Sequence, residues 1–132
     1  MFLILFVTSI LLNTSSSAKF PLEIKKVWNS LTIKYQDECL YLSKTNPDYP
    51  RLMVENGYVP NDLSFGCYLR CIYEKTGALK PDGQFDITII LRKVSYMSEN
   101  LSVRCIREAE NEDDFCKKSL IAGNCTVMAI IE

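Results

Sequence analysis

The sequence predicts a small all-α domain that disulfide bonds stabilise. Three observations support this fold class: a length of 132 residues, apolar residues that recur every three to four positions, and six cysteines. A chain of this length is enough for one domain. An even number of cysteines in so short a chain is typical of disulfide-bonded proteins from an oxidising compartment. We therefore expect one secreted, extracellular helical domain.

The N-terminal segment has the pattern of a signal peptide. Residues 2–12 are almost wholly apolar, and small polar residues follow over 13–18. We predict a signal peptide over residues 1–18 and a folded domain over residues 19–132. No Lys or Arg precedes the apolar segment, so an N-terminal helix of the folded domain is the alternative. No apolar run reaches the roughly 18 residues that span a bilayer, and we expect no stable membrane insertion.

A long first helix is expected over residues 21–46. Pro21 suits a first helical turn, and an apolar stripe of helical period runs from Trp28 to Leu42. The helix should end at Asn46, because the residue before a proline is pushed out of the helical region.

Two shorter helices should follow. Residues 52–54 favour a short helix that closes at Asn56–Gly57. Asn61 or Asp62 then caps a helix that ends at Gly77. Residues 81–83, Pro-Asp-Gly, form a turn.

Residues 85–94 fit two kinds of element. Their β-branched residues suit a strand. Four apolar residues nevertheless fall at the i, i+3, i+4, i+7 spacing of a helix, and Asp86 is a good N-cap. These residues are Ile87, Ile90, Leu91 and Val94. We predict a helix.

Two helices complete the domain. One begins at Ser98, and the last is expected over residues 112–122, with acidic residues in its first turn. Gly123–Asn124 should end this last helix, and a short apolar tail follows Cys125.

The six cysteines stand at positions 39, 67, 71, 105, 116 and 125, separated by 27, 3, 33, 10 and 8 residues. Cys67 and Cys71 lie one helical turn apart on the same face, so each should bond a different helix. Six cysteines allow 15 pairings, and spacing alone does not choose among them. Zinc is the alternative use of such cysteines, but the chain has no histidine and no paired C-x-x-C motif.

This spacing resembles that of the six-cysteine insect odorant-binding proteins, the pheromone- and general odorant-binding family. The gaps of three and eight residues are the family's most constant features. The stretch from Cys116 to Cys125 is similar to ant and other hymenopteran members. The resemblance implies about six helices around an internal apolar cavity. It also implies three disulfides: Cys39–Cys71, Cys67–Cys116 and Cys105–Cys125.

The resemblance implies a secreted carrier that takes a small hydrophobic ligand, an odorant or pheromone, through aqueous lymph towards an olfactory receptor. The carrier would be a monomer or a homodimer. Two alternatives stay open. One is a related carrier or scavenger of lipids or amines in saliva, venom or reproductive fluid. The other is a secreted interaction or defence protein with a filled core and no ligand.

The residue inventory argues against enzymatic and nucleic-acid functions. Without histidine, a Ser-His-Asp or Cys-His arrangement cannot form, and bridged cysteines leave no free nucleophile. The acidic run over residues 108–114 is typical of a solvated face. The net charge of −1, with both signs interspersed, offers no basic stripe for a phosphate backbone. We expect no enzyme, no cofactor and no metal.

Candidate ligand-binding residues are apolar or aromatic residues of the later helices and of the C-terminal tail. They are Tyr73, Ile87, Ile90, Leu91, Val94, Met97, Val127, Met128 and Ile130. We expect the tail to line one wall of the cavity. Without histidine, ligand affinity should depend only weakly on pH between about 5 and 7.

Overall fold

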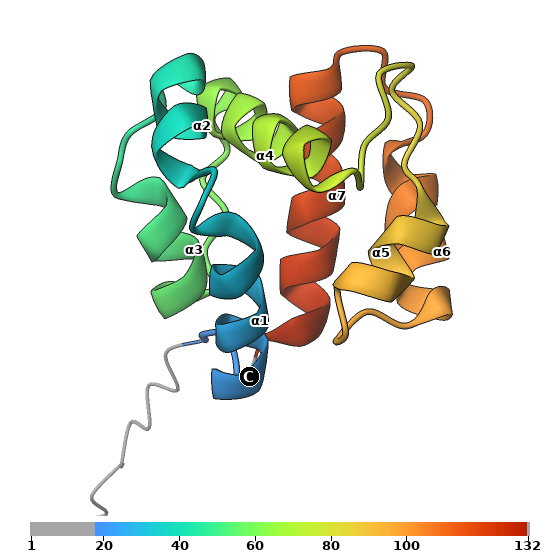
Figure 1. The fold of residues 1–132 in the computed structure, drawn as a ribbon, viewed down its shortest axis with the longest axis horizontal. Helices are drawn as coiled ribbons and strands as arrows, with labels where there is room; N and C mark the ends of the chain where they lie inside the picture. Colours follow the sequence, from blue (N-terminus) through green and yellow to red (C-terminus); the bar gives the residue numbers. More distant parts are fainter. Residues whose placement is uncertain (1–17, 132) are drawn as a thin grey trace, which may run out of the picture.

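The computed structural model describes residues 18–131 (Figure 1). Apart from Ala18, the predicted signal peptide lies outside the described residues, as does Glu132. The all-α fold class is confirmed, and the described residues form seven helices. They are α1 (Leu22–Thr32), α2 (Gln36–Ser43), α3 (Tyr49–Asn56), α4 (Leu63–Thr76), α5 (Ile87–Lys93), α6 (Glu99–Ala109) and α7 (Phe115–Ile130).

The prediction of one long helix over residues 21–46 is wrong, because the chain turns at residues 33–35 and forms α1 and α2. At the break, the N–H of Tyr35 donates to the carbonyl oxygen of Thr32, three residues earlier. This tighter bond interrupts the i to i−4 ladder of an α-helix. Because of this bend, α1 contributes to the wall of the interior, and α2 places Cys39 next to Cys71 of α4.

Four helices begin at a side-chain cap. The carboxylate or hydroxyl of each N-cap accepts a hydrogen bond from a backbone N–H of the first turn. These caps are Asp62 of α4, Asp86 of α5, Ser98 of α6 and Asp114 of α7. Gly57 and Gly77 end α3 and α4 in the left-handed region, with φ of 60° and 84°. The sequence prediction of a helix rather than a strand over residues 85–94 is confirmed by α5.

The last helix does not end at Gly123–Asn124, as the sequence suggested, but continues to Ile130. Gly123 is buried. A Cβ atom at this position would lie 2.8 Å from Cδ1 of Leu69 and 3.1 Å from the hydroxyl oxygen of Tyr73, both on α4. The glycine therefore permits close helix packing, and the expected tail becomes the last turns of α7.

Helices α4 and α7 pack against each other at the centre of the fold, with α1–α3 on one side and α5 and α6 on the other (Figure 1). The core residues of α4 are almost inaccessible to solvent: Phe65, Tyr68, Leu69 and Ile72. Burial of such side chains is the main favourable contribution to folding.

Three disulfides join the helices, and they are the pairs that the resemblance implies. Cys39–Cys71 links α2 to α4, Cys67–Cys116 links α4 to α7, and Cys105–Cys125 links α6 to α7. No cysteine is free. The bridges close loops that would be open in the unfolded chain, which stabilises the folded state by about 2–4 kcal/mol each.

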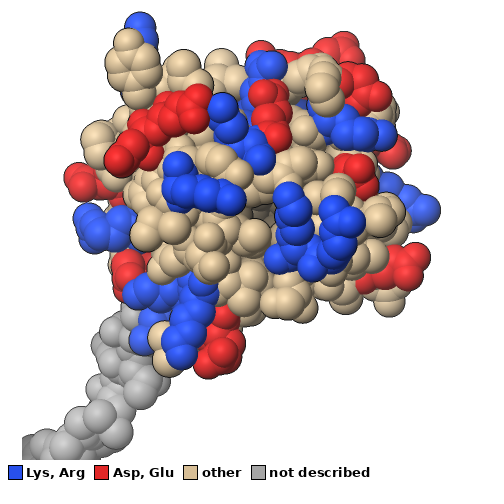
Figure 2. All heavy atoms as spheres, in the orientation of Figure 1, with Lys and Arg blue, Asp and Glu red and all other residues tan. Residues whose placement is uncertain are grey.

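The surface carries both signs of charge. On the face drawn in Figure 2, Lys, Arg, Asp and Glu side chains are spread over the surface, and uncharged atoms lie between them. In the described part of the chain, no helix has the length and apolarity needed to cross a membrane.

Candidate binding cavity

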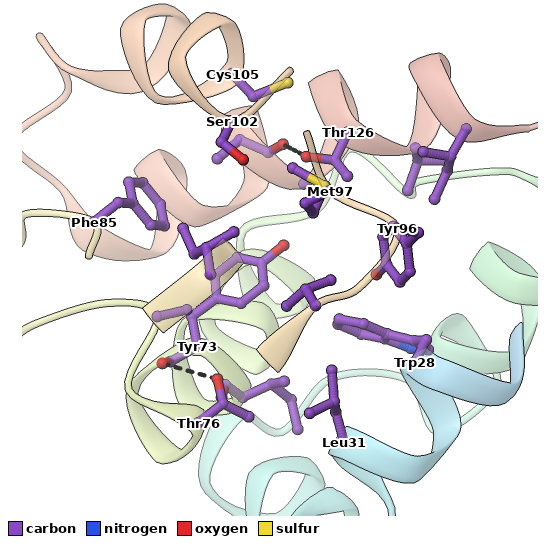
Figure 3. A pocket seen from close by; sticks show the side chains of 18 of the residues that line it. Trp28, Leu31, Tyr73, Thr76, Phe85, Tyr96, Met97, Ser102, Cys105 and Thr126 are labelled. Atoms are coloured by element: carbon purple, nitrogen blue, oxygen red, sulfur yellow. Dashed lines mark hydrogen bonds between the residues drawn. The ribbon is translucent and has the colours of Figure 1, made fainter. Parts of the chain in front are cut away.

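An apolar cavity of about 90 Å³ lies inside the helical fold (Figure 3). Its wall draws on every helix except α2. The lining residues are Phe20, Trp28, Leu31, Thr32, Met53, Ile72, Tyr73, Thr76, Ala78, Phe85, Ile90, Val94, Tyr96, Met97, Ser102, Cys105, Ile106, Ala122, Gly123, Thr126, Val127 and Ile130. The described wall contains no Asp, Glu, Lys or Arg.

Helical spacing explains which side chains reach the cavity. On α7, Ala122, Thr126 and Ile130 recur every four residues and so lie on one face. On α4, Ile72 and Thr76 have the same relation. The Cys105–Cys125 disulfide fixes α6 against α7 beside this face, with its two Cα atoms 5.4 Å apart.

The structure brings six of the nine candidate residues to the cavity wall. They are Tyr73, Ile90, Val94, Met97, Val127 and Ile130. Val127 and Ile130 belong to the expected tail, which therefore contributes to one wall as part of α7.

The other three candidates lie elsewhere, which corrects the sequence analysis for Ile87, Leu91 and Met128. Each helical residue is rotated by about 100° from the one before it. Leu91 and Met128 lie on the outer faces of their helices, where they are 36% and 63% exposed. Ile87 lies in the first turn of α5, one turn before the buried Ile90.

Sequence reasoning missed several wall residues. On α6, Ser102, Cys105 and Ile106 have the i, i+3, i+4 spacing, so a helical pattern was present and overlooked. Tyr96 gave no such signal. It lies in the turn between α5 and α6, where the N–H of Met97 donates to the carbonyl oxygen of Val94 (2.9 Å).

Most of the wall's aliphatic hydroxyls are bound within their own helices. The Oγ1 atom of Thr76 donates to the carbonyl oxygen of Ile72 (2.9 Å), and that of Thr126 donates to Ala122 (2.9 Å). The Oγ atom of Ser102 donates to the carbonyl oxygen of Ser98 (2.7 Å). Because these three hydroxyls already donate to backbone carbonyls, they offer no proton to a ligand, and the wall stays largely apolar.

Two tyrosines add phenol groups to a wall that also includes the indole N–H of Trp28 and the hydroxyl of Thr32. Burial raises the pKa of Tyr73 and of Tyr96 above the usual value, and the nearby Tyr73 raises the pKa of Tyr96 further. Both phenols are consequently neutral at physiological pH. Figure 3 shows them on two sides of the cavity, with their hydroxyl oxygens directed into it.

A second, more polar groove of about 190 Å³ lies beside the cavity, between α1, α3 and α4. Lys25 of α1 and Glu55 of α3 form an ion pair at this groove (2.5 Å). The hydrogen bond and charge of Lys25 hold the pKa of the Glu55 carboxyl below its usual value. Trp28 and Thr32 line both spaces, so they lie between the apolar cavity and the polar groove.

Within residues 18–131, no group of three or more His, Cys, Asp or Glu side chains could hold a metal ion. The cavity geometry supports binding through apolar contacts, with hydroxyl groups as its polar component.

Comparison with protein families gives one match. The model described as the PBP/GOBP family matches residues 27–129, which include all six cysteines, the whole of α2–α6 and most of α7. A search of curated proteins and a search of solved structures found no match.

Proposed function

Because the chain belongs to the PBP/GOBP family, we propose that it is a secreted carrier of a small, neutral odorant or pheromone. The ligand occupies the internal cavity and is carried through aqueous lymph towards an olfactory receptor. The family is one of binding proteins for small hydrophobic ligands rather than of enzymes. The observation that carries the proposal for this chain is its apolar cavity with an uncharged wall.

Burial of apolar surface drives binding in such a cavity. Removal of apolar surface from water contributes about 25 cal/mol per Å². The proposed contact residues are the wall residues of α4, α5 and α7. Secretion agrees with the chemistry of the chain, because six bridged cysteines require an oxidising compartment.

The size of the cavity indicates that the wall adjusts to larger ligands. About 90 Å³ is less than the roughly 150 Å³ of an engineered apolar cavity that accepts benzene. Met53 and Met97 both belong to the wall. Their unbranched, flexible side chains can move with little loss of contact. We expect these two residues to account for most of the adjustment.

The uncharged wall favours neutral ligands over amines. An ammonium group in an apolar cavity requires a carboxylate partner, and the described wall has none. A fatty-acid carboxylate likewise finds no Lys or Arg there. A defence or interaction protein would need no such cavity, so the carrier function is the better supported one.

Filling the cavity tests the proposal. Val127→Phe places an aromatic ring in the wall, whereas Met128→Phe places the same ring on the exposed face of α7. We expect Val127→Phe to lower the affinity for N-phenyl-1-naphthylamine at least tenfold, and Met128→Phe to leave it unchanged. Fluorescence titration measures the affinity, and thermal unfolding verifies that both variants are folded.

Equal affinity in the two folded variants would show that the probe binds outside the cavity. Absence of probe uptake by the correctly bridged wild-type protein would contradict the carrier function itself.

A further inference from the structure

The hydroxyl groups of the cavity differ in how their protons are used. Those of Thr76, Ser102 and Thr126 donate to backbone carbonyls of their own helices. The hydroxyls of Tyr73 and Tyr96 have no hydrogen-bond partner among the described residues, and Figure 3 draws none. The cavity wall therefore contains two partly buried phenols whose protons are free for a ligand.

The two phenols come from different elements and face the same space. Tyr73 projects from α4, and Tyr96 projects from the turn between α5 and α6 (Figure 3). They do not bond each other. Charge on one phenol would affect the other, since Tyr73 contributes to the raised pKa of Tyr96. Both tyrosines belong to the wall of one cavity of about 90 Å³, so a ligand in this small space contacts both of them.

The Tyr73 donor is held in place by its neighbours. Its ring packs edge-on against Phe85, with ring centroids 6.0 Å apart. Its hydroxyl oxygen lies 3.1 Å from the point that a Cβ atom of residue 123 would occupy, so Gly123 provides the room for it. A donor that is already positioned loses little entropy when a ligand binds.

We propose that Tyr73 and Tyr96 form a donor pair that selects ligands with a carbonyl oxygen on an apolar chain: ketones, aldehydes or esters. This inference rests on the proposed carrier function. A carbonyl oxygen has two lone pairs and accepts from two donors, while it offers no proton of its own. The wall excludes charged alternatives, because it has no side chain to neutralise them.

If the donor pair acts as proposed, the protein should prefer a ketone over an alkane of the same chain length. The probes are 2-undecanone and undecane, which share a chain length and differ in the carbonyl group. We expect the protein to bind the ketone about tenfold more tightly than the alkane in competition with N-phenyl-1-naphthylamine. Each of Tyr73→Phe and Tyr96→Phe should lower ketone affinity about 3–10-fold, because each removes one hydrogen bond. Alkane affinity should stay the same or rise.

Tyr41→Phe is the control, since Tyr41 is 81% exposed and lies outside the cavity. Infrared spectroscopy distinguishes the loss of a hydrogen bond to the ligand from a change in the shape of the cavity. The infrared carbonyl stretch of the bound ketone should lie at a lower frequency than in hexane, and the double variant Tyr73→Phe/Tyr96→Phe should restore the hexane value. All proteins are secreted from insect cells as the full chain.

Two results would overturn the donor pair while leaving the carrier function intact. One is equal wild-type affinity for ketone and alkane. The other is an equal loss of both affinities in the Tyr→Phe variants, with no change in carbonyl frequency. Failure of both ligands to displace the probe, or to bind at all, would instead count against the cavity as the ligand site.

Discussion

Replacement of Gly66 by alanine should destabilise the fold, although alanine is the better helix former. Gly66 lies within α4 and is buried against the backbone of α7. A Cβ atom here would overlap the carbonyl oxygen of Cys116 and lie 3.2 Å from Cβ of Leu120. The neighbouring Cys67–Cys116 disulfide holds the two helices together at this point, with Cα atoms 4.3 Å apart.

Two opposing effects determine the magnitude. Alanine in a helix interior is favoured over glycine by about 1 kcal/mol. Ordinary contact with Cys116 would require α4 and α7 to separate by about 1 Å. Overpacking of this kind costs about 1–3 kcal/mol, and the upper value applies because a backbone atom cannot rotate away. We expect a net loss of about 2 kcal/mol, a decrease in Tm of about 8 °C.

Thermal and urea unfolding of the oxidised proteins measure this loss. Asn124→Ala on the exposed side of α7 is the control, because it raises helix propensity without a new contact. Gly123→Ala should lose less than Gly66→Ala, since its nearest atoms are the ends of side chains. A Gly66→Ala protein as stable as the wild type would refute the close-packing argument for α4 and α7.

Three further predictions concern the N-cap of α4, the buried Tyr68 and cleavage of the signal peptide. Asp62→Ala should lower the unfolding free energy by about 1 kcal/mol, because the backbone N–H of α4 loses its acceptor; the neighbouring Asn61→Ala should change it little, and equal urea midpoints for the two variants would contradict this. Burial raises the pKa of Tyr68 to about 12, against about 10 in an unfolded chain. The unfolded state therefore loses this proton first, so the contribution of Tyr68 to stability should be constant below pH 10 and fall towards pH 12; an unchanged urea midpoint at pH 8 and 11 would exclude this linkage. N-terminal sequencing of the secreted protein should begin at Lys19, and an intact Met1 would disprove the predicted cleavage.

Local features of the fold were predictable from the sequence because they depend on residues a few positions apart. The capping roles of Asp86 and Ser98 follow from side chains that reach the next turn of backbone. The end of α4 at Gly77 follows from the ease with which glycine adopts positive φ. Each of these positions was named from the sequence, and the structure places it as expected.

Features that depend on distant contacts were not predictable in this way. In the sequence, Gly123 is typical of a helix end, yet in the structure it lies within α7 and lets Leu69 and Tyr73 of α4 pack closely against this helix. The break at residues 33–35 separates two helices that serve different neighbours, although their apolar stripe is continuous in the sequence. Tyr96 faces the cavity from a turn, where no periodic pattern identifies the side that is buried.

The sequence by itself determined the helical class, several helix boundaries and, through the cysteine spacing, the family to which the chain belongs. These properties follow from backbone preferences and from residue spacing along the chain. Only the tertiary structure decided which apolar faces enclose a cavity and which fill the core. Hydrophobic periodicity shows that a face is buried, but the volume left between faces depends on how closely the helices approach one another. That approach is set by residues such as Gly66 and Gly123, whose neighbours lie far away in the sequence.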